Sequence, residues 1–177
     1  MANKRAEVID LVLAPNPDAV DSVDVQGNTA LHYAAMYCNP ISAKRLIFQN
    51  PDVATHKNFK DQMPIHKAFS FIHETQSRLR WKQLELVRII LDENPETVSQ
   101  RDKKGRLPLH LAVHFDSAIE IIEAVYSIYP TAALIADLEG HLPIHFTTNA
   151  TVQRLLLGAS KPLQQVGITS SFAQFSV

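Results

Sequence analysis

Cysteine is almost absent from this sequence, since Cys38 is the one residue of its type among 177. A single cysteine cannot form a disulfide within the chain. The first ten residues also lack the apolar run of a secretory signal peptide. These two absences together predict an intracellular protein, cytoplasmic or nuclear, in a reducing compartment.

The sequence also lacks long apolar runs and an excess of charge of one sign. No stretch approaches the roughly 18 uninterrupted apolar residues of a membrane span. The 17 basic and 18 acidic residues are interspersed and give a formal net charge of -1. No overall field therefore attracts nucleic acid or an anionic membrane surface, and we expect neither as a partner.

Motifs of metal, nucleotide and nucleophile chemistry are missing as well. The sequence contains no HExxH, no glycine-rich phosphate loop and no paired cysteines, so zinc and nucleotide sites lack their ligand patterns. No sequence motif places a general base beside Cys38, and we interpret this residue as a small, partly buried one. We therefore predict no cofactor, no bound metal and no intrinsic catalysis.

What the sequence does contain is a repeat. In four segments a proline precedes a histidine by 15 positions, and turn-forming residues stand seven and ten positions after the proline. Turn formers at fixed offsets predict a tight, hairpin-like loop in each unit. The segments are Pro17 to His32, Pro51 to His66, Pro95 to His110 and Pro130 to His145. The turn formers are Asp24 and Gly27, Asn58 and Asp61, Asp102 and Gly105, Asp137 and Gly140.

Helices are expected between each histidine and the next proline, where apolar residues recur at helical spacing. Leu84, Val87, Ile90 and Leu91, for example, form one stripe. The first helices are predicted near 30–38, 64–72, 108–115 and 143–149. Their partners are predicted near 40–49, 79–93, 117–129 and 150–158, with Asn39-Pro40 and Asp116-Ser117 as two of the helix starts.

Around the histidines the four units read TALHYAA, MPIHKAF, LPLHLAV and LPIHFTT. Together with the preceding turns, this pattern resembles the TPLHxA signature of ankyrin repeats over roughly residues 3 to 158. The resemblance implies an all-α repeat fold: an ankyrin solenoid of helix-turn-helix units joined by hairpin-like loops. It predicts about four repeats plus a partial N-terminal one. The expected boundaries are a repeat array over 1–159, with a partial repeat 1–16 and repeats near 17–50, 51–94, 95–129 and 130–159, and a loosely ordered tail over 160–177.

The sequence departs from the family pattern at both ends of the first helices. The threonine that caps the first helix is kept at Thr29 alone and is replaced by Met63, Leu107 and Leu142 in the later units. The glycine that usually ends this helix is also missing. Its positions hold Cys38, Ile72, Asp116 and Thr151.

Eight histidines allow two interpretations. His110 with His114, and His141 with His145, are spaced four apart and could share a metal ion, so a His-based metal-dependent enzyme is a minor alternative. Against this, one histidine recurs in every unit at the same position, as a structural residue bonding neighbouring turns would do. We favour that interpretation. The residues assigned to the structural repeat motif are His32, His66, His110, His145, Gly27, Gly105 and Gly140.

The resemblance also implies a function, because ankyrin repeats look like binding modules without catalysis of their own. We expect a scaffold or adaptor that holds another protein on its concave face. Tyr37, Phe71, Phe115 and Ala150 stand five residues beyond the signature histidines, and the first three would form a ladder of aromatic anchors. Further contacts are expected from Phe59, Lys60, Gln62, Lys103, Lys104, Arg106 and His114.

The predicted partner is a protein segment with an apolar or aromatic stretch flanked by acidic residues, because positive charge gathers at the tip of the third unit. The chain itself is expected to be a monomer. An alternative function is that of a regulatory ankyrin segment within a larger enzyme or channel. Its basis is that the sequence starts inside a repeat, with Ala6 to Leu13 reading as a lone second helix.

Overall fold

The computed structural model describes residues 17–70 and 77–158, and within these ranges it contains helices and no strand. The α-helices are α2 (Ala30–Met36), α3 (Pro40–Gln49), α4 (Pro64–Phe69), α5 (Ser77–Glu93), α6 (Pro108–His114), α7 (Ile119–Ile128) and α8 (Ala150–Gly158). The 3-10 helices are η1 (Pro17–Val20), η2 (Pro51–Thr55), η3 (Pro95–Ser99), η4 (Pro130–Leu134) and η5 (Pro143–Phe146). The predicted partial repeat 1–16 and tail 160–177 lie outside the described residues.

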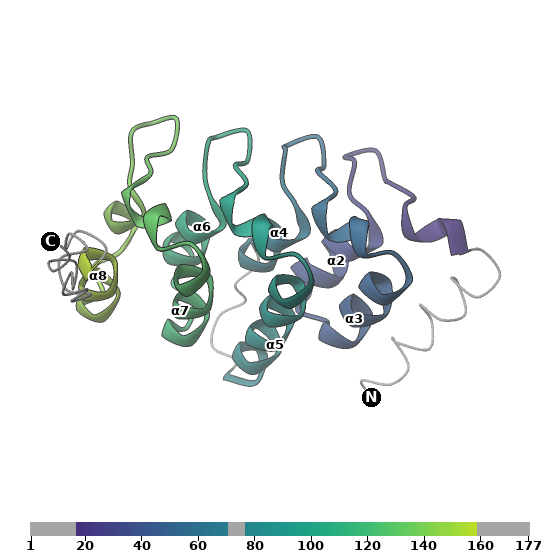
Figure 1. The fold of residues 1–177 in the computed structure, drawn as a ribbon, viewed down its shortest axis with the longest axis horizontal. Helices are drawn as coiled ribbons and strands as arrows, with labels where there is room; N and C mark the ends of the chain where they lie inside the picture. Colours follow the sequence, from purple (N-terminus) through teal and green to yellow (C-terminus); the bar gives the residue numbers. More distant parts are fainter. Residues whose placement is uncertain (1–16, 71–76, 159–177) are drawn as a thin grey trace, which may run out of the picture.

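The helices pack in sequential pairs, α2 with α3, α4 with α5 and α6 with α7. Helices of the same kind also contact each other from one unit to the next, so that α4 lies between α2 and α6, and α5 between α3 and α7. Figure 1 shows α3, α5, α7 and α8 in one row, with the loops that join the units projecting on one side. The all-helical, pairwise arrangement agrees with the prediction. No helix in the described ranges is long and apolar enough to cross a membrane.

The core lies between the two rows of helices. The first helices contribute Leu31, Ile65 and Leu109, which occupy equivalent positions and are all fully buried. From the second row, Val87 and Ile90 of the predicted stripe are also fully buried. A continuous apolar layer of this kind is what each helix pair needs from its neighbours, because one pair alone cannot bury both of its faces.

The helix boundaries follow local chemistry. The Asn39 side chain accepts a hydrogen bond from the backbone N–H of Ser42 at 3.2 Å and Pro40 is the first helical residue, so this predicted start of α3 is confirmed. The predicted start at Asp116-Ser117 is wrong, because α7 begins at Ile119. Asp116 instead adopts a left-handed conformation (φ 50°) at the end of α6, as Cys38 does (φ 49°) at the end of α2. These residues thus take the conformation that the missing glycine usually provides.

The fourth unit differs from the prediction at its first helix. A helix was expected over 143–149, but the chain forms only the short 3-10 turn η5. Thr147 leaves the helix in an extended conformation, and its Oγ1 accepts a hydrogen bond from the Asn149 N–H at 3.1 Å. Asn149 in turn caps α8 by accepting from the Thr151 N–H at 2.9 Å. Side chains that bond the local backbone compete with the helical bonds, and two of them do so directly after η5.

The extra residues of the second unit lengthen its second helix. α5 has 17 residues, whereas α3 and α7 have 10 each. Phe71 and Ile72, which belong to the same insertion, lie outside the described residues. Trp81 on α5 is 57% exposed, with the Lys82 ammonium 5.7 Å from its ring centroid. One apolar member of the insertion therefore faces solvent.

Candidate functional site

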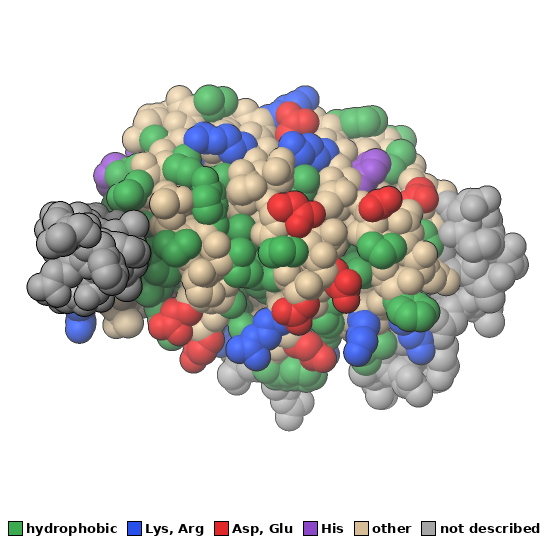
Figure 2. Space-filling view, viewed as in Figure 1, with side chains coloured by type: hydrophobic (Ala, Val, Ile, Leu, Met, Phe, Trp, Pro, Cys, Tyr) green, Lys and Arg blue, Asp and Glu red, His purple; other side chains and the backbone are tan. Residues whose placement is uncertain are grey.

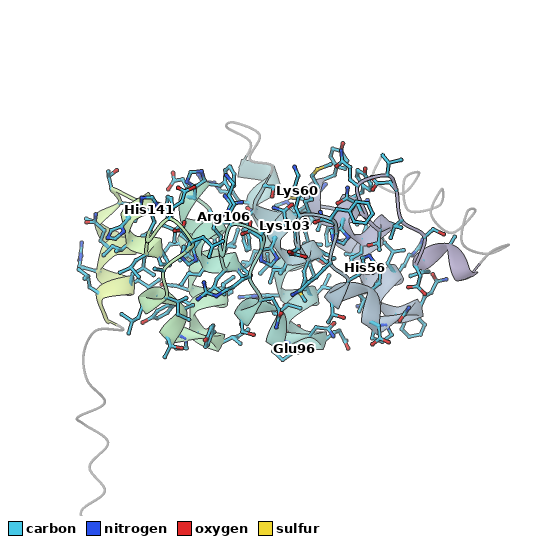
Figure 3. All side chains as sticks on the ribbon, turned by 90° about the horizontal axis from the view of Figure 1, so that it is seen from above. His56, Lys60, Glu96, Lys103, Arg106 and His141 are labelled. Carbon is cyan, nitrogen blue, oxygen red and sulfur yellow. The ribbon has the colours of Figure 1, made fainter. Side chains whose placement is uncertain are left out.

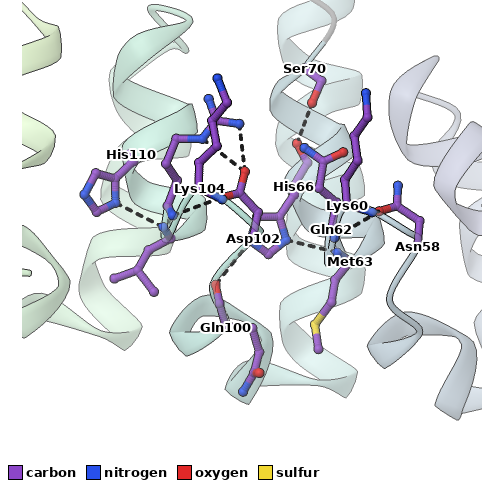
Figure 4. A network of polar contacts seen from close by, with 12 residues as sticks. Asn58, Lys60, Gln62, Met63, His66, Ser70, Gln100, Asp102, Lys104 and His110 are labelled. Atoms are coloured by element: carbon purple, nitrogen blue, oxygen red, sulfur yellow. Dashed lines mark hydrogen bonds and ion pairs between the residues drawn. The ribbon is translucent and has the colours of Figure 1, made fainter. Parts of the chain in front are cut away.

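Each hairpin loop is held by one carboxylate or amide. In the third unit Asp102 Oδ1 accepts a hydrogen bond from the N–H group of Lys104 at 2.9 Å (Figure 4). It accepts a second one from the N–H group of Arg106 at 3.0 Å. The Gly105 N–H closes the turn on the Asp102 carbonyl at 2.8 Å. Asp24, Asn58 and Asp137 accept the same pair of bonds in their own units. Because the backbone bonds point inward, the two residues after each carboxylate or amide form an exposed tip.

Neighbouring tips are joined to one another by the backbone. The N–H groups of Phe59, Lys103 and Leu138 each donate to a carbonyl of the preceding tip, at Gln26, Lys60 and Lys104 respectively, and every bond is 3.0 Å long. Seen from above in Figure 3, Lys60, Lys103, Arg106 and His141 follow one another along this row of loops. The tips therefore hold their side chains at fixed relative positions.

Two of the tip residues also cover a glycine of the preceding loop. A Cβ placed on Gly27 would lie 2.9 Å from Phe59 Cδ1, and one on Gly105 would lie 2.8 Å from Leu138 Cγ. Both glycines have positive φ, at 77° and 75°. Glycine is therefore favoured at both positions for two reasons: the turn needs a positive φ, and the neighbouring side chain leaves no space for a Cβ.

The signature histidines connect each unit to the next. His66 Nδ1 accepts a hydrogen bond from the Met63 N–H at 3.1 Å, and its Nε2–H donates to the Gln100 carbonyl at 3.1 Å (Figure 4). His32 and His110 do the same, from Nε2 to the carbonyls of Gln62 (2.9 Å) and His141 (3.2 Å). Since Nδ1 accepts from a backbone N–H, the proton resides on Nε2 and the ring is neutral.

This geometry explains how the first helices start without a threonine. The histidine lies at the third helical position and accepts the N–H of the capping residue, the role that a glutamate or glutamine plays in a capping box. Burial lowers the pKa of His32 and of His66 to about 4. Burial lowers the pKa of His110 as well. Protonation at Nδ1 would remove the cap, so the neutral ring is part of the structure.

In the fourth unit the histidine makes only half of these contacts. His145 Nδ1 accepts from the Leu142 N–H at 3.1 Å, but no described residue accepts from its Nε2. Its side chain is exposed, whereas His66 and His110 are fully buried. The local cap therefore forms here, whereas the described residues provide no cross-unit bond.

The histidines that the metal alternative would use make other contacts in the structure. Both ring nitrogens of His110 already have backbone partners. His114 and His141 pack edge-on against the ring of Phe146, with centroids 5.1 and 5.5 Å away. Over 17–70 and 77–158, no group of three or more His, Cys, Asp or Glu side chains could hold a metal ion.

The residues predicted to contact a partner fall into three groups. Tyr37, Phe59, Lys60, Lys103, Lys104 and His114 are exposed. Gln62 is buried, Phe115 is half-buried against the core, and the Arg106 side chain forms a salt bridge with Asp102 at 2.7 Å. Phe71 lies outside the described residues. The structure therefore brings together the tip lysines and Phe59, but it does not show the predicted aromatic ladder.

The prediction overlooked Tyr33 and Lys67. Tyr33 is 40% exposed on α2, and its hydroxyl donates to Asp24 Oδ2, which holds the pKa of that carboxyl well below its usual range. Partial burial, with the Lys60 charge, lowers the pKa of Lys67. A signal was present in the sequence, because each of these residues directly follows a signature histidine and so lies on the first helix beside the tips.

Three lysines at the second and third tips, Lys60, Lys103 and Lys104, are exposed. Among the described residues no carboxylate forms an ion pair with Lys60, Lys103 or Lys104, although Arg106 is paired with Asp102. Burial alone would raise the pKa of Asp102, but hydrogen bonds from Arg106 outweigh it and keep the carboxylate ionised. The Asp102 charge is thus paired with Arg106, whereas the lysine charges face solvent.

Comparison with known protein families identifies one segment of the chain. Residues 26–58, which run from the first hairpin through α2 and α3 to the second hairpin, match the model of the ankyrin repeat family. No curated protein matches the chain. Ankyrin repeats are generally protein-binding modules and usually have no catalytic activity.

Proposed function

Because residues 26–58 form an ankyrin repeat, we propose that the chain is an ankyrin solenoid of four repeats with a partial repeat at its N-terminus. We propose that it acts as a scaffold or adaptor that binds another protein and has no catalytic activity. The observation that carries this proposal is the repetition of the same contacts at three successive junctions. At each, a tip N–H bonds the preceding tip and a histidine Nε2–H bonds the following unit.

The proposed binding surface, which we call the tip surface, consists of Phe59, Lys60, Lys103 and Lys104, with Tyr33 of α2 and Tyr37 at the C-cap of α2. Its aromatic side chains are exposed, at 64% for Phe59 and 58% for Tyr37. Aromatic anchors that become buried in a complex dominate the binding energy of protein interfaces. The surface therefore offers anchors for an apolar or aromatic stretch of the partner.

The lysines define the second property of the partner. Lys60 and Lys103 are joined by a backbone bond of 3.0 Å between their tips, and Lys104 follows directly. A row of positive charges with no carboxylate paired to it among the described residues favours acidic residues that flank the apolar stretch. Such a complex would form faster at low salt than at high salt, because the lysines are exposed.

The test is a pull-down with mass spectrometry, followed by binding measurements with the captured protein. Lys103→Glu with Lys104→Glu should abolish capture and leave the melting temperature unchanged, because both side chains are exposed. Arg80→Glu with Arg154→Glu is the matched control, since these residues are also exposed and the change in net charge is the same. Equal loss of capture in both variants would contradict the tip surface.

Tyr37→Ala tests the apolar half of the proposal separately. We expect at least a tenfold loss of affinity if the ring is an anchor, with unchanged folding. A variant that melts earlier but binds normally per folded molecule would show that Tyr37 serves stability instead.

A further inference from the structure

A groove of about 350 Å³ lies on the outer row of helices, between α3 and α5. Figure 1 shows these two helices side by side. Ile47 and Ile89 contribute to its walls, the first of them almost fully buried. The groove is formed by helices other than those that carry the proposed tip surface.

An exposed aromatic ring stands at the edge of this groove. Phe48 lines it and is nevertheless 88% exposed, the highest exposure of any described aromatic residue. A cavity of about 150 Å³ is enough to hold benzene, so the groove has room for one phenyl ring. Phe48 itself does not fill it. One face thus carries both a protruding ring and a space of the size that such a ring needs.

The charges beside the groove are also complementary to each other. Lys44 lies on the α3 side, and Asp92 with Glu93 lies on the α5 side, all of them exposed. Figure 2 shows basic, acidic and apolar side chains interspersed over this view of the molecule. A two-fold axis running along the groove would place Lys44 of one copy opposite the two carboxylates of the other, and the reverse.

We propose that two copies of the chain associate through this groove as a two-fold symmetric dimer, in which each copy inserts Phe48 into the groove of the other. A two-fold contact requires a surface that is complementary to itself. A ring beside a cavity and a positive charge beside negative ones satisfy that requirement. The dimer replaces the monomer expected from the sequence and does not depend on the proposed function of the tip surface.

The first test is sedimentation velocity over a range of protein concentrations. With one aromatic anchor per copy, we expect a dissociation constant on the order of 10–100 µM. Phe48→Ser should weaken association at least tenfold and leave the circular dichroism melting curve unchanged, because the ring is exposed. A wild-type chain that stays monomeric at every concentration overturns the proposal. This holds even if Phe48 then proves to bind another protein.

The second test exchanges charges. Lys44→Glu alone, and Asp92→Lys with Glu93→Lys, should each be monomeric, because like charges then face each other in the dimer. An equimolar mixture of the two variants should dimerise, since every facing pair is again of opposite sign. Failure of the mixture to associate overturns the two-fold arrangement, as do assemblies larger than a dimer.

The tip surface supplies the control. Lys103→Glu with Lys104→Glu should dimerise as the wild type does, although it is expected to lose partner capture. Conversely, Phe48→Ser should keep partner capture. The dimer and the tip surface can therefore fail independently.

Discussion

The first three units and the fourth unit carry the same local motif and end in different structures. All four have the carboxylate or amide that holds the hairpin and the histidine that accepts the cap N–H. In the first three, the histidine also bonds the next unit, and the first helix has six or seven residues. In the fourth, that second bond has no described acceptor and the helix shrinks to η5.

This difference separates the contacts that a unit makes within itself from the contacts that its neighbour provides. The hairpin needs only local residues, because its bonds span four positions. A longer first helix accompanies a histidine that is buried by the following unit, as His66 is. Stability in such an array is approximately the sum of unit and junction contributions, and the junction contribution is open to experiment.

Acid should disrupt the junctions before it disrupts the hairpins. Burial lowers the pKa of His32 and His66 from 6.5 to about 4. The stability that these two neutral rings contribute is therefore fully present above pH 6.5 and is lost as the pH falls toward 4. Between pH 7 and 5 we expect a loss of about 2 kcal/mol from each histidine. Urea unfolding at several pH values measures it. The lowered carboxyl pKa values of Asp102 and Asp137 act only at lower pH.

His66→Gln sharpens this test. It should reduce the slope of stability against pH, because one buried neutral ring is removed. A slope equal to that of the wild type would contradict the assignment of the acid response to the junctions.

Truncating a junction histidine should cost more than truncating the terminal one. His110→Ala leaves the Leu107 N–H and the His141 carbonyl without their buried partner, and we expect a loss of about 1 to 3 kcal/mol. His145→Ala removes one bond at an exposed site and should cost about 0.5 kcal/mol. The free energy of unfolding from urea titration compares them. Equal costs would show that the cap, rather than the junction, dominates.

The hairpin glycines offer the same comparison at the tips. Gly105→Ala would place its Cβ 2.8 Å from Leu138 Cγ and 2.9 Å from the Leu138 nitrogen, whereas nothing lies within 4 Å of a Cβ on Gly140. Positive φ alone should cost about 1 kcal/mol in Gly140→Ala. The added overlap should raise the loss in Gly105→Ala to about 2 kcal/mol. Similar melting temperatures for the two variants would mean that the tips separate easily.

The sequence predicted the parts of this fold that depend on local motifs. The hairpins and the bounds of α3 and α8 follow from turn residues, proline and cap positions close to them in the chain. The left-handed Asp116 was missed, because backbone bonds from Asp116 and Ser117 back to Val113 and Ala112 close α6 where the sequence indicated a helix start. The short η5 was missed, because the Thr147 and Asn149 side chains bond the local backbone just after it. In the candidate site, exposure follows position in the hairpin. Lys103 and Lys104 occupy the tip and are exposed, while Gln62 lies at the base beneath His32 and is buried.

The smallest expected effect concerns the two threonines after η5. Thr147→Ala with Thr148→Ala removes the side-chain bond to the Asn149 N–H and replaces two β-branched residues by the best helix former. If local competition is what shortens the first helix of the fourth unit, the helical circular dichroism signal should rise slightly and stability should increase by about 0.5 kcal/mol. The Asn149 cap of α8 must be retained, so Asn149 is left unchanged. An unchanged signal would instead attribute the short turn to the lack of an acceptor for His145 Nε2 among the described residues. In that case the difference in first-helix length between the units would depend on the neighbouring unit alone.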